Sequence, residues 1–217
     1  MSNAPSDRTR VKRLPKRGAY DKDTIHAILD EGLVCHVGIA VDGQPFVMPM
    51  AYARDGDRIL IHGSRASRVM KAIADGVDLC VTVTHNDGLV LARSAFHHSM
   101  NYRSVVILGR GRSIDDAKEK LDAFRRYFDG LIPGRWDDVR PPNRVEMDQT
   151  LMVEVPIDEV SAKARTGPPA EEEEDYALDA WAGLIPMESV ANPPVADDHL
   201  RDGVDTPDYA TYYTRKK

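Results

Sequence analysis

LVCHVGIAVDGQPFVMPMAYARDGDRILIHG, residues 33–63, is the stretch that decides the fold. It holds three runs rich in apolar and β-branched residues, separated by Asp42-Gly43 and by Asp55-Gly56. An Asp-Gly pair between two apolar runs is typical of a β-hairpin, because glycine adopts the positive φ angles of a tight turn without steric cost. The stretch therefore predicts three antiparallel strands in a meander.

Similar apolar runs recur further along the chain, and Asn86-Asp87-Gly88 stands between two of them as another turn signal. With the meander they predict about seven strands, the later ones over residues 78–85, 88–96, 104–112 and 150–157. Apolar residues at helical spacing predict helices over residues 21–31, 64–76 and 115–128. Turns this short exclude parallel crossovers, and closure removes the edges of a sheet. We expect a mainly β fold: an antiparallel barrel with a few peripheral helices.

The composition indicates a single soluble core that binds a small ligand. The 217 residues are 42% hydrophobic and carry a formal net charge of −6, which argues against a nucleic-acid partner. No apolar run reaches the length of a membrane span or a secretory signal, so we expect a cytoplasmic protein without a membrane partner. Cys35 and Cys80 each lie inside an apolar run and predict buried free thiols.

Charge is unevenly distributed and suggests how the chain is divided. Six cations fall within residues 8–17, and residues 171–175 are five consecutive acids. Like-charge runs usually mark solvated segments, although the basic run has the alternative of crossing to a partner subunit. We expect a basic N-terminal arm over residues 1–20, a barrel domain over 21–166, and a C-terminal extension over 167–217 that wraps the barrel or is partly mobile.

The segment DRILIHGSRASRVMKAI, residues 57–73, suggests an anion site. Here a predicted strand gives way to a predicted helix, where free backbone N–H groups and the helix dipole favour an anion. Arginine clamps phosphate with charge-assisted hydrogen bonds, and serine hydroxyls add donors. The side chains available at this corner are Ser64, Arg65, Ser67 and Arg68. The alternative is an ordinary N-cap at Ser64 followed by solvated arginines.

A family resemblance rests on four segments in this order: PFVMPMAYARDGDRILIHGSRASRVMKAI (45–73), LVLARSAFHHSMNYRSVVILGRG (89–111), SAKARTG (161–167) and WAGLIP (181–186). Together they resemble the pyridoxamine 5'-phosphate oxidase-related, FMN-binding split-barrel family, in the flavin-nucleotide-binding branch that includes nitroimidazole-reductase-like proteins. The resemblance implies an antiparallel split β-barrel that forms a homodimer, with one FMN at each end of the interface.

The resemblance also implies site residues. Along the isoalloxazine ring would lie Val47, Met48, Pro49 and Met50, and near the ribityl phosphate His62, Ser64, Ser67 and Arg68, with Arg65 a weaker candidate. Asn101 would belong to the pocket wall, and the C-terminal motif would bring Lys163, Arg165 and Trp181 near the flavin. No catalytic base is assigned; the candidates for substrate orientation or proton delivery are Tyr102, His98 and Arg103.

Several of these residues have simpler interpretations. Met48 and Met50 have the alternative of core or interface packing, and Trp181 that of anchoring the tail. His97 and His98 do not predict a metal site, because neighbouring strand residues point to opposite faces.

We therefore predict an FMN-binding flavoprotein, an oxidoreductase acting on a small molecule. The alternatives are a non-catalytic flavin or haem carrier or sensor, and a deazaflavin-dependent reductase. A true pyridoxamine phosphate oxidase is disfavoured, because the C-terminal YATYYTRKK lacks that group's basic signature.

Overall fold

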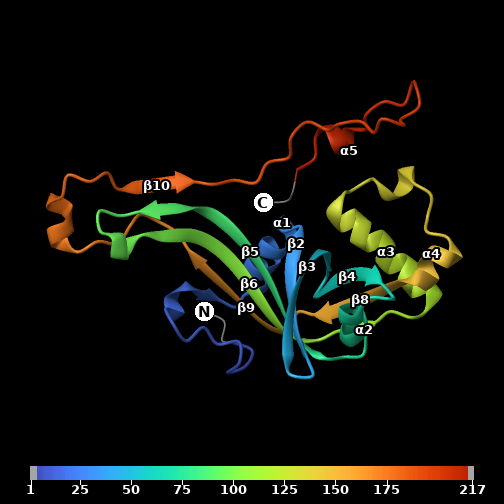
Figure 1. Cartoon of the computed structure of the whole chain (residues 1–217), viewed down its shortest axis with the longest axis horizontal. Coiled ribbons are helices and arrows are strands. Elements are labelled where there is room, and N and C mark those ends of the chain that lie inside the picture. Colours follow the sequence, from blue (N-terminus) through green and yellow to red (C-terminus); the bar gives the residue numbers. More distant parts are fainter. Residues whose placement is uncertain (1–3, 215–217) are drawn as a thin grey trace.

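The computed structural model describes residues 4–214, so the last three residues of the expected C-terminal extension lie outside it. One antiparallel sheet dominates, with its strands in the order β1-β9-β6-β5-β2-β3-β4-β8-β7 and with β10 paired to β5 (Figure 1). The strands are β1 (Gly18–Ala19), β2 (Val34–Val41), β3 (Gln44–Asp55), β4 (Arg58–Ser64), β5 (Asp78–Leu91), β6 (Ser99–Arg110), β7 (Arg112–Ser113), β8 (Thr150–Pro156), β9 (Glu159–Arg165) and β10 (Gly183–Pro186). The helices are α1 (Lys22–Glu31), α2 (Arg68–Ala74), α3 (Ala117–Leu131), α4 (Arg144–Gln149) and α5 (Asp208–Thr211).

The predicted meander is confirmed as β2, β3 and β4. The β2–β3 turn has φ of 51° at Asp42 and 77° at Gly43, the paired positive angles that a two-residue hairpin turn requires. Gly56, with φ of 61°, occupies the turn between β3 and β4. The three predicted helices are also present, with Asp21, Ser67 and Asp116 as N-caps that accept hydrogen bonds from backbone N–H groups.

The predicted turn at Asn86-Asp87-Gly88 is wrong, because β5 runs through it as one strand. The register against β6 slips between Asn86 and Gly88, so the segment forms a β-bulge. Glycine is needed there for a different reason: its φ is 154°, and a Cβ at this position would lie 2.7 Å from the carbonyl oxygen of Ile185 in β10. The Asp-Gly signal therefore marks a close backbone approach, and the chain reverses only beyond Leu91.

Four of the ten strands were not expected. Three of them, β1, β7 and β10, are two to four residues long. The longer β9 was missed because Val160, Ala162 and Ala164 alternate with polar residues and form no continuous apolar run. The two ends of the sheet path are β1 and β7, and among the described residues no pairing joins them. The sheet curls without closing, which gives the split barrel that the resemblance implied.

Two hydrophobic clusters hold the barrel together. The larger lies inside the curled sheet and is roofed by α1, with Leu29, Cys35, Tyr52 and Val81 among its fully buried members. The smaller lies between the sheet and α3 and includes Leu60 and Tyr127. Burial of the Cys35 thiol raises its pKa to about 12, as expected for a structural cysteine.

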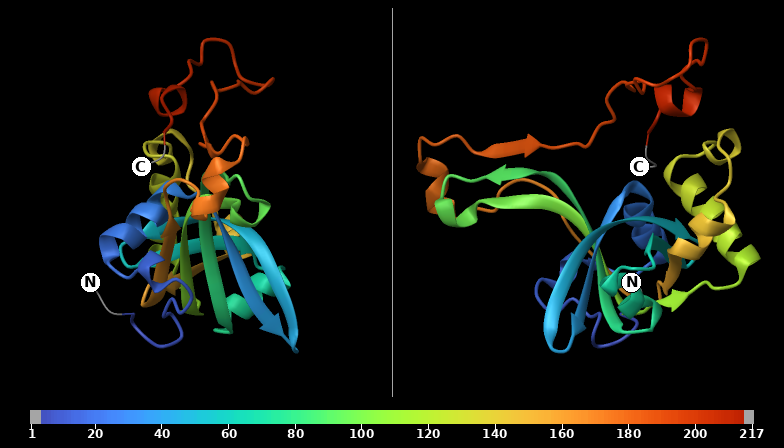
Figure 2. Two further views of the ribbon diagram at one scale, coloured as in Figure 1. Left: turned by 90° about the vertical axis from the view of Figure 1, so that its left-hand side faces the viewer. Right: turned by 45° about the vertical axis from the view of Figure 1, so that its right-hand side comes forward.

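A long ribbon projects from the barrel, formed by the ends of β5 and β6 with β10 alongside (Figure 2). We call Gly88–Asn101 together with β10 the arm. Glu171, in the acidic run expected to be solvated, instead has a buried side chain that accepts hydrogen bonds from the backbone and guanidinium of Arg93. The arm is therefore braced by the segment that follows β9.

The basic N-terminal arm lies against the sheet and is not fully solvated. Thr9 is 5% exposed, and a cavity of about 250 Å³ lies between this N-terminal segment and strands β6 and β9.

No helix in the part of the chain from residue 4 to 214 is long and apolar enough to span a bilayer.

Candidate functional site

The first component of the site is an open edge of β3. Residues 44–51 of this strand pair with β2, whereas residues 52–55 pair with β4 on the other side. Along residues 44–51 the second edge therefore has no strand partner in the described structure. Backbone N–H and C=O groups at such an edge are available to a ligand.

The second component is the corner between β4 and α2. Ser67 ends this corner as the N-cap of α2, its hydroxyl oxygen accepting a 3.3 Å hydrogen bond from Met70 N–H. The Ser64 hydroxyl oxygen likewise accepts from Ala66 N–H. Because both oxygens act as acceptors in these contacts, each hydroxyl hydrogen stays free to donate to an anion.

Arg68 joins the two components. Its guanidinium carbon lies 4.5 Å from the centre of the Phe46 ring of β3, a cation–π contact that brings the start of α2 against the open edge. Arg68 is exposed, and no carboxylate pairs with it among residues 4–214. Its N–H donors are therefore available at the corner.

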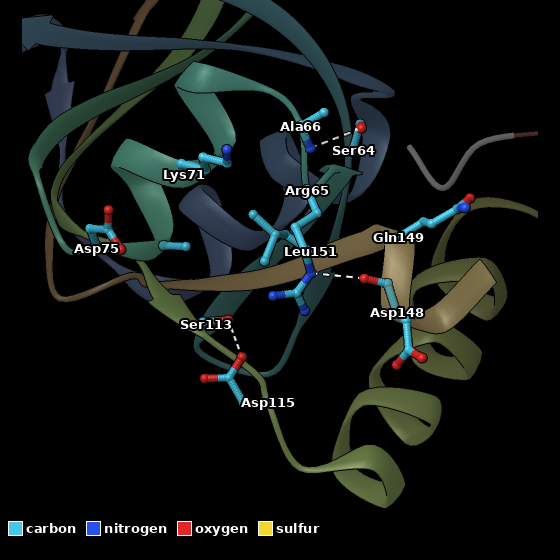
Figure 3. Close-up of a pocket in the computed structure, with 11 residues that line it drawn as sticks. Ser64, Arg65, Ala66, Lys71, Asp75, Ser113, Asp115, Asp148, Gln149 and Leu151 are labelled. Atoms are coloured by element: carbon cyan, nitrogen blue, oxygen red, sulfur yellow. Dashed lines mark hydrogen bonds between the residues drawn. The ribbon is translucent and has the colours of Figure 1, made fainter. Parts of the chain in front are cut away.

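A cavity lies beside this corner, but no residue of β3 lines it (Figure 3). Its volume is about 850 Å³, and its walls carry three carboxylates, those of Asp75, Asp115 and Asp148, against two cations, Arg65 and Lys71. The Arg65 Nε donates to the carbonyl oxygen of Asp148 at 2.8 Å, so this side chain braces the end of α4. A phosphate is disfavoured here, because the carboxylates repel it.

The structure does not place His62 at the corner. Its ring lies under α3, edge-on to Tyr127 with 4.7 Å between ring centres, and tilted against Phe124 at 5.6 Å. Neighbouring strand residues face opposite sides, so Ile61 enters the barrel core and His62 does not. Burial lowers the pKa of His62, and its Nδ1 has no hydrogen-bond partner in the described structure. The ring of His62 therefore packs against the side chains of α3.

The four predicted ring contacts on β3 divide between two faces of the strand. Met48 and Met50 lie on the barrel side, where Met50 packs against the core and Met48 remains 43% exposed. Val47 and Pro49 lie on the outer side. Only backbone atoms along the open edge can serve a single ligand from all four positions.

The outer face of the β2–β3 hairpin is exposed and carries no charge. Cross-strand partners place Val34 beside Ala51, His36 beside Pro49 and Gly38 beside Val47. Val47 is 64% exposed and Val34 48% exposed. An uncharged, mostly apolar sheet face of this kind marks an interaction surface.

Asn101 and Arg165, both predicted to lie near the flavin, contact each other. The Arg165 guanidinium donates to Asn101 Oδ1 at 2.5 Å and to the carbonyl oxygen of Pro168 at 3.1 Å, while Asn101 Nδ2 donates to the carbonyl oxygen of Gly167. Both side chains are less than a tenth exposed. This pair fixes the turn that follows β9.

Arg103 is held by two carboxylates. It donates to Glu31 at the end of α1 and to Asp87 in the bulge of β5. These bonds raise the pKa of Arg103, with the Glu31 contact contributing most. Arg103 therefore braces the bulge, with four of its five N–H donors bound to the two carboxylates.

The remaining predicted residues lie away from the corner. Lys163 faces the basic N-terminal segment and lines the smaller cavity together with four cations of that segment. The Trp181 ring rests against Gly183 at the start of β10 and is 69% exposed. His98 stands at the tip of the arm and Tyr102 further along β6. The arm lies far from α2, so one chain does not bring His98 to Arg68 (Figure 1).

Two features of the site were missed from the sequence. The open edge of β3 depends on where β4 stops pairing, which no local signal announces. The uncharged outer face did leave a signal: alternate residues from Val34 to Ala40 and from Pro45 to Ala51 include no charged side chain. No group of three or more possible metal ligands occurs among the described residues.

Known proteins resemble this chain over most of its length. The family described as Pyridoxamine 5'-phosphate oxidase matches residues 21–164. The flavocytochrome Anf3 from Azotobacter vinelandii is 43% identical, with a TM-score of 0.93 over 99% of this chain and 100% of its own. The FAD and heme binding protein from Mycobacterium smegmatis is 31% identical, with a TM-score of 0.88 over 92% of this chain and 98% of its own.

A putative 5-nitroimidazole antibiotic resistance protein from Bacteroides thetaiotaomicron shares the fold at 22% identity, with a TM-score of 0.57 over 67% of this chain and 85% of its own. No protein with a curated description matches the sequence. Since the family match spans well over half of the residues and includes β2 to β8, the resemblance drawn from the sequence is confirmed, and the chain belongs to the pyridoxamine 5'-phosphate oxidase family.

Proposed function

We propose that the protein is a flavin-dependent redox protein that holds its flavin by the ribityl phosphate at the β4–α2 corner. The observation that carries this proposal is the unpaired, exposed guanidinium of Arg68 beside the open edge of β3. Ser64 and Ser67 add hydroxyl donors at the same corner. Charge-assisted hydrogen bonds from arginine are the strongest contacts that a phosphate makes with side chains.

The ring of the flavin fits the edge of β3. An isoalloxazine carries hydrogen-bond donors and acceptors along one edge, and unpaired backbone groups near Val47 and Met48 supply their complements. When bound, the flavin supplies the electron or hydride chemistry, while the chain orients it and limits access. Arg68 fixes one end of the cofactor and the β3 edge the other.

We propose FMN, because it is the smallest cofactor that can contact both the phosphate corner and the open edge of β3. The mycobacterial relative is named for FAD, which carries the same ribityl phosphate with an adenylate beyond it. The phosphate corner serves either form. Releasing the chromophore from the purified protein and separating FMN from FAD by chromatography distinguishes them.

A second copy of the chain completes the site in this proposal. Its support is the uncharged face of the β2–β3 hairpin, where Val34 and Val47 are exposed, and the arm, which lies far from the β4–α2 corner of its own chain (Figure 1). A symmetric dimer buries such a face against its own copy, and the arm of one subunit can then reach the corner of the other.

Haem is the second prosthetic group that we propose. The two relatives that resemble this chain over more than nine tenths of its length are named as a flavocytochrome and as a FAD and heme binding protein. Their similarity extends past residue 164, where the family match ends, and for the flavocytochrome it covers 99% of this chain and so includes β10. Histidine on an apolar surface is the usual haem-binding arrangement, and the arm carries both.

The absorbance spectrum of the purified, full-length protein tests these assignments. Flavin bands near the visible–ultraviolet boundary support the main proposal, and a Soret band supports haem. Adding a nicotinamide cofactor under anaerobic conditions and following flavin bleaching separates an oxidoreductase from a carrier. A preparation that stays colourless and takes up neither FMN nor FAD contradicts the flavin assignment.

A further inference from the structure

One face of the arm is an uncovered apolar platform. Ile185 of β10, Leu89 of β5 and Met100 of β6 are direct cross-strand partners, so their side chains lie in one row across three strands. Each of the three is between 39% and 47% exposed. A row of exposed Ile, Leu and Met with no charge among them is typical of a surface that binds an apolar partner.

The opposite face of the arm is already covered. Val90, next to Leu89, is 1% exposed, and Asn101, next to Met100, is 8% exposed. The segment after β9 supplies this cover, since the Gly167 carbonyl accepts a hydrogen bond from Asn101. The exposure of the platform therefore belongs to that one face and is not a general property of a projecting ribbon.

His98 stands at the end of the platform with its ring already oriented. It lies two residues before Met100, so the extended chain directs both side chains to the same side. His98 Nδ1 is 3.0 Å from the carbonyl oxygen of Ser94. A carbonyl oxygen can only accept, so Nδ1 holds the proton, and Nε2 carries the lone pair that a metal requires.

We propose that His98 is an axial haem ligand and that the platform of Ile185, Leu89 and Met100 receives the apolar face of the macrocycle. This inference rests on the haem part of the proposed function. A backbone carbonyl that binds the second ring nitrogen is the usual device for fixing a ligating histidine. The exposed Nε2 of His98 has no hydrogen-bond partner among residues 4–214.

Five of the six other histidines are less suited to this role by their contacts, and the sixth, His199, lies in the C-terminal extension, where no hydrogen bond orients its ring among residues 4–214. His97 lies 3.7 Å from a Glu172 carboxylate oxygen, His26 lies 3.3 Å from Asp57, and His85 Nε2 is bonded to the Ile28 carbonyl. His62 is packed under α3. His36 is exposed on the uncharged hairpin face, but no hydrogen bond orients its ring in the described structure.

The test uses full-length protein reconstituted with hemin, in wild-type form and as His98→Ala, His97→Ala and His36→Ala. Bound haem is measured by the Soret band, and the ligation state by electron paramagnetic resonance of the ferric form. Flavin content and thermal melting of each variant confirm that the fold is intact. For His98→Ala we expect loss of haem, or a change to a high-spin signal that added imidazole reverses, with flavin content unchanged.

His97→Ala, the neighbouring control, should keep the wild-type spectrum. A wild-type spectrum in His98→Ala, or the loss of haem in His36→Ala instead, overturns the assignment of the ligand while leaving haem binding in place. Failure of the wild-type protein to bind hemin overturns the haem part of the proposed function, and this inference with it. The flavin proposal is untouched by that result, because flavin content is measured separately.

Discussion

Replacing Arg68 by glutamine removes the exposed cation that lies beside the open edge of β3 and keeps a polar, uncharged side chain. Each charge-assisted hydrogen bond to the phosphate contributes about 1.5–3 kcal/mol. Since about 1.4 kcal/mol corresponds to a tenfold change in affinity, the loss of one such bond should raise the Kd for FMN roughly 10- to 150-fold. Riboflavin, which lacks the phosphate, should bind the variant and the wild type equally.

The same change should leave the stability of the apoprotein nearly unaltered. The substitution removes the cation–π contact between Arg68 and Phe46, which stabilises the fold by about 0.5–1 kcal/mol. Arg68 is also the first residue of α2, where a positive charge opposes the helix dipole by about 0.3–1 kcal/mol. These two effects oppose each other, so affinity should change while the melting temperature does not.

The assay is the quenching of flavin fluorescence as apoprotein is titrated into FMN or riboflavin, with thermal melting recorded in parallel. Arg201→Gln, which makes the same substitution on the C-terminal extension, is the matched control and should behave as the wild type. If Arg68→Gln weakens the binding of riboflavin as much as the binding of FMN, or weakens the binding of neither, the corner is not a phosphate site.

Three further predictions concern the rest of the structure. Because burial lowers the pKa of His62 below its ordinary value of 6.5, the unfolded chain takes up this proton first; stability should therefore fall as pH drops below about 6.5, and denaturant melts of His62→Phe should show a weaker fall. Asn101→Ala leaves the Arg165 guanidinium short of an acceptor and should cost about 1.5–3 kcal/mol of unfolding free energy, whereas a change below about 0.5 kcal/mol would show the pair to be unimportant. Val47→Glu places a charge on the uncharged hairpin face and should convert a dimer to a monomer in light scattering, and an unchanged mass would move the interface elsewhere.

The sequence by itself determined those features that depend on neighbouring residues. Asp42-Gly43 specifies a hairpin because the positive φ angles of its turn are a local steric requirement. Asp21 predicts a helix start because its carboxylate accepts a hydrogen bond from a backbone N–H three residues away. Together with the antiparallel strands and the order of the motifs, these local features were enough to predict the fold class and the family.

Only the tertiary structure decided which side chains are free to act. Arg68 and Arg103 are equally cationic in the sequence, yet Arg103 is held by carboxylates from two other elements and Arg68 has none. Gly88 looks like a turn residue until β10 is found beside it. Whether a side chain is paired depends on partners that lie tens of residues away along the chain. The sequence pattern does not record these partners, because such contacts form only once the strands have paired and the chain has curled around its core.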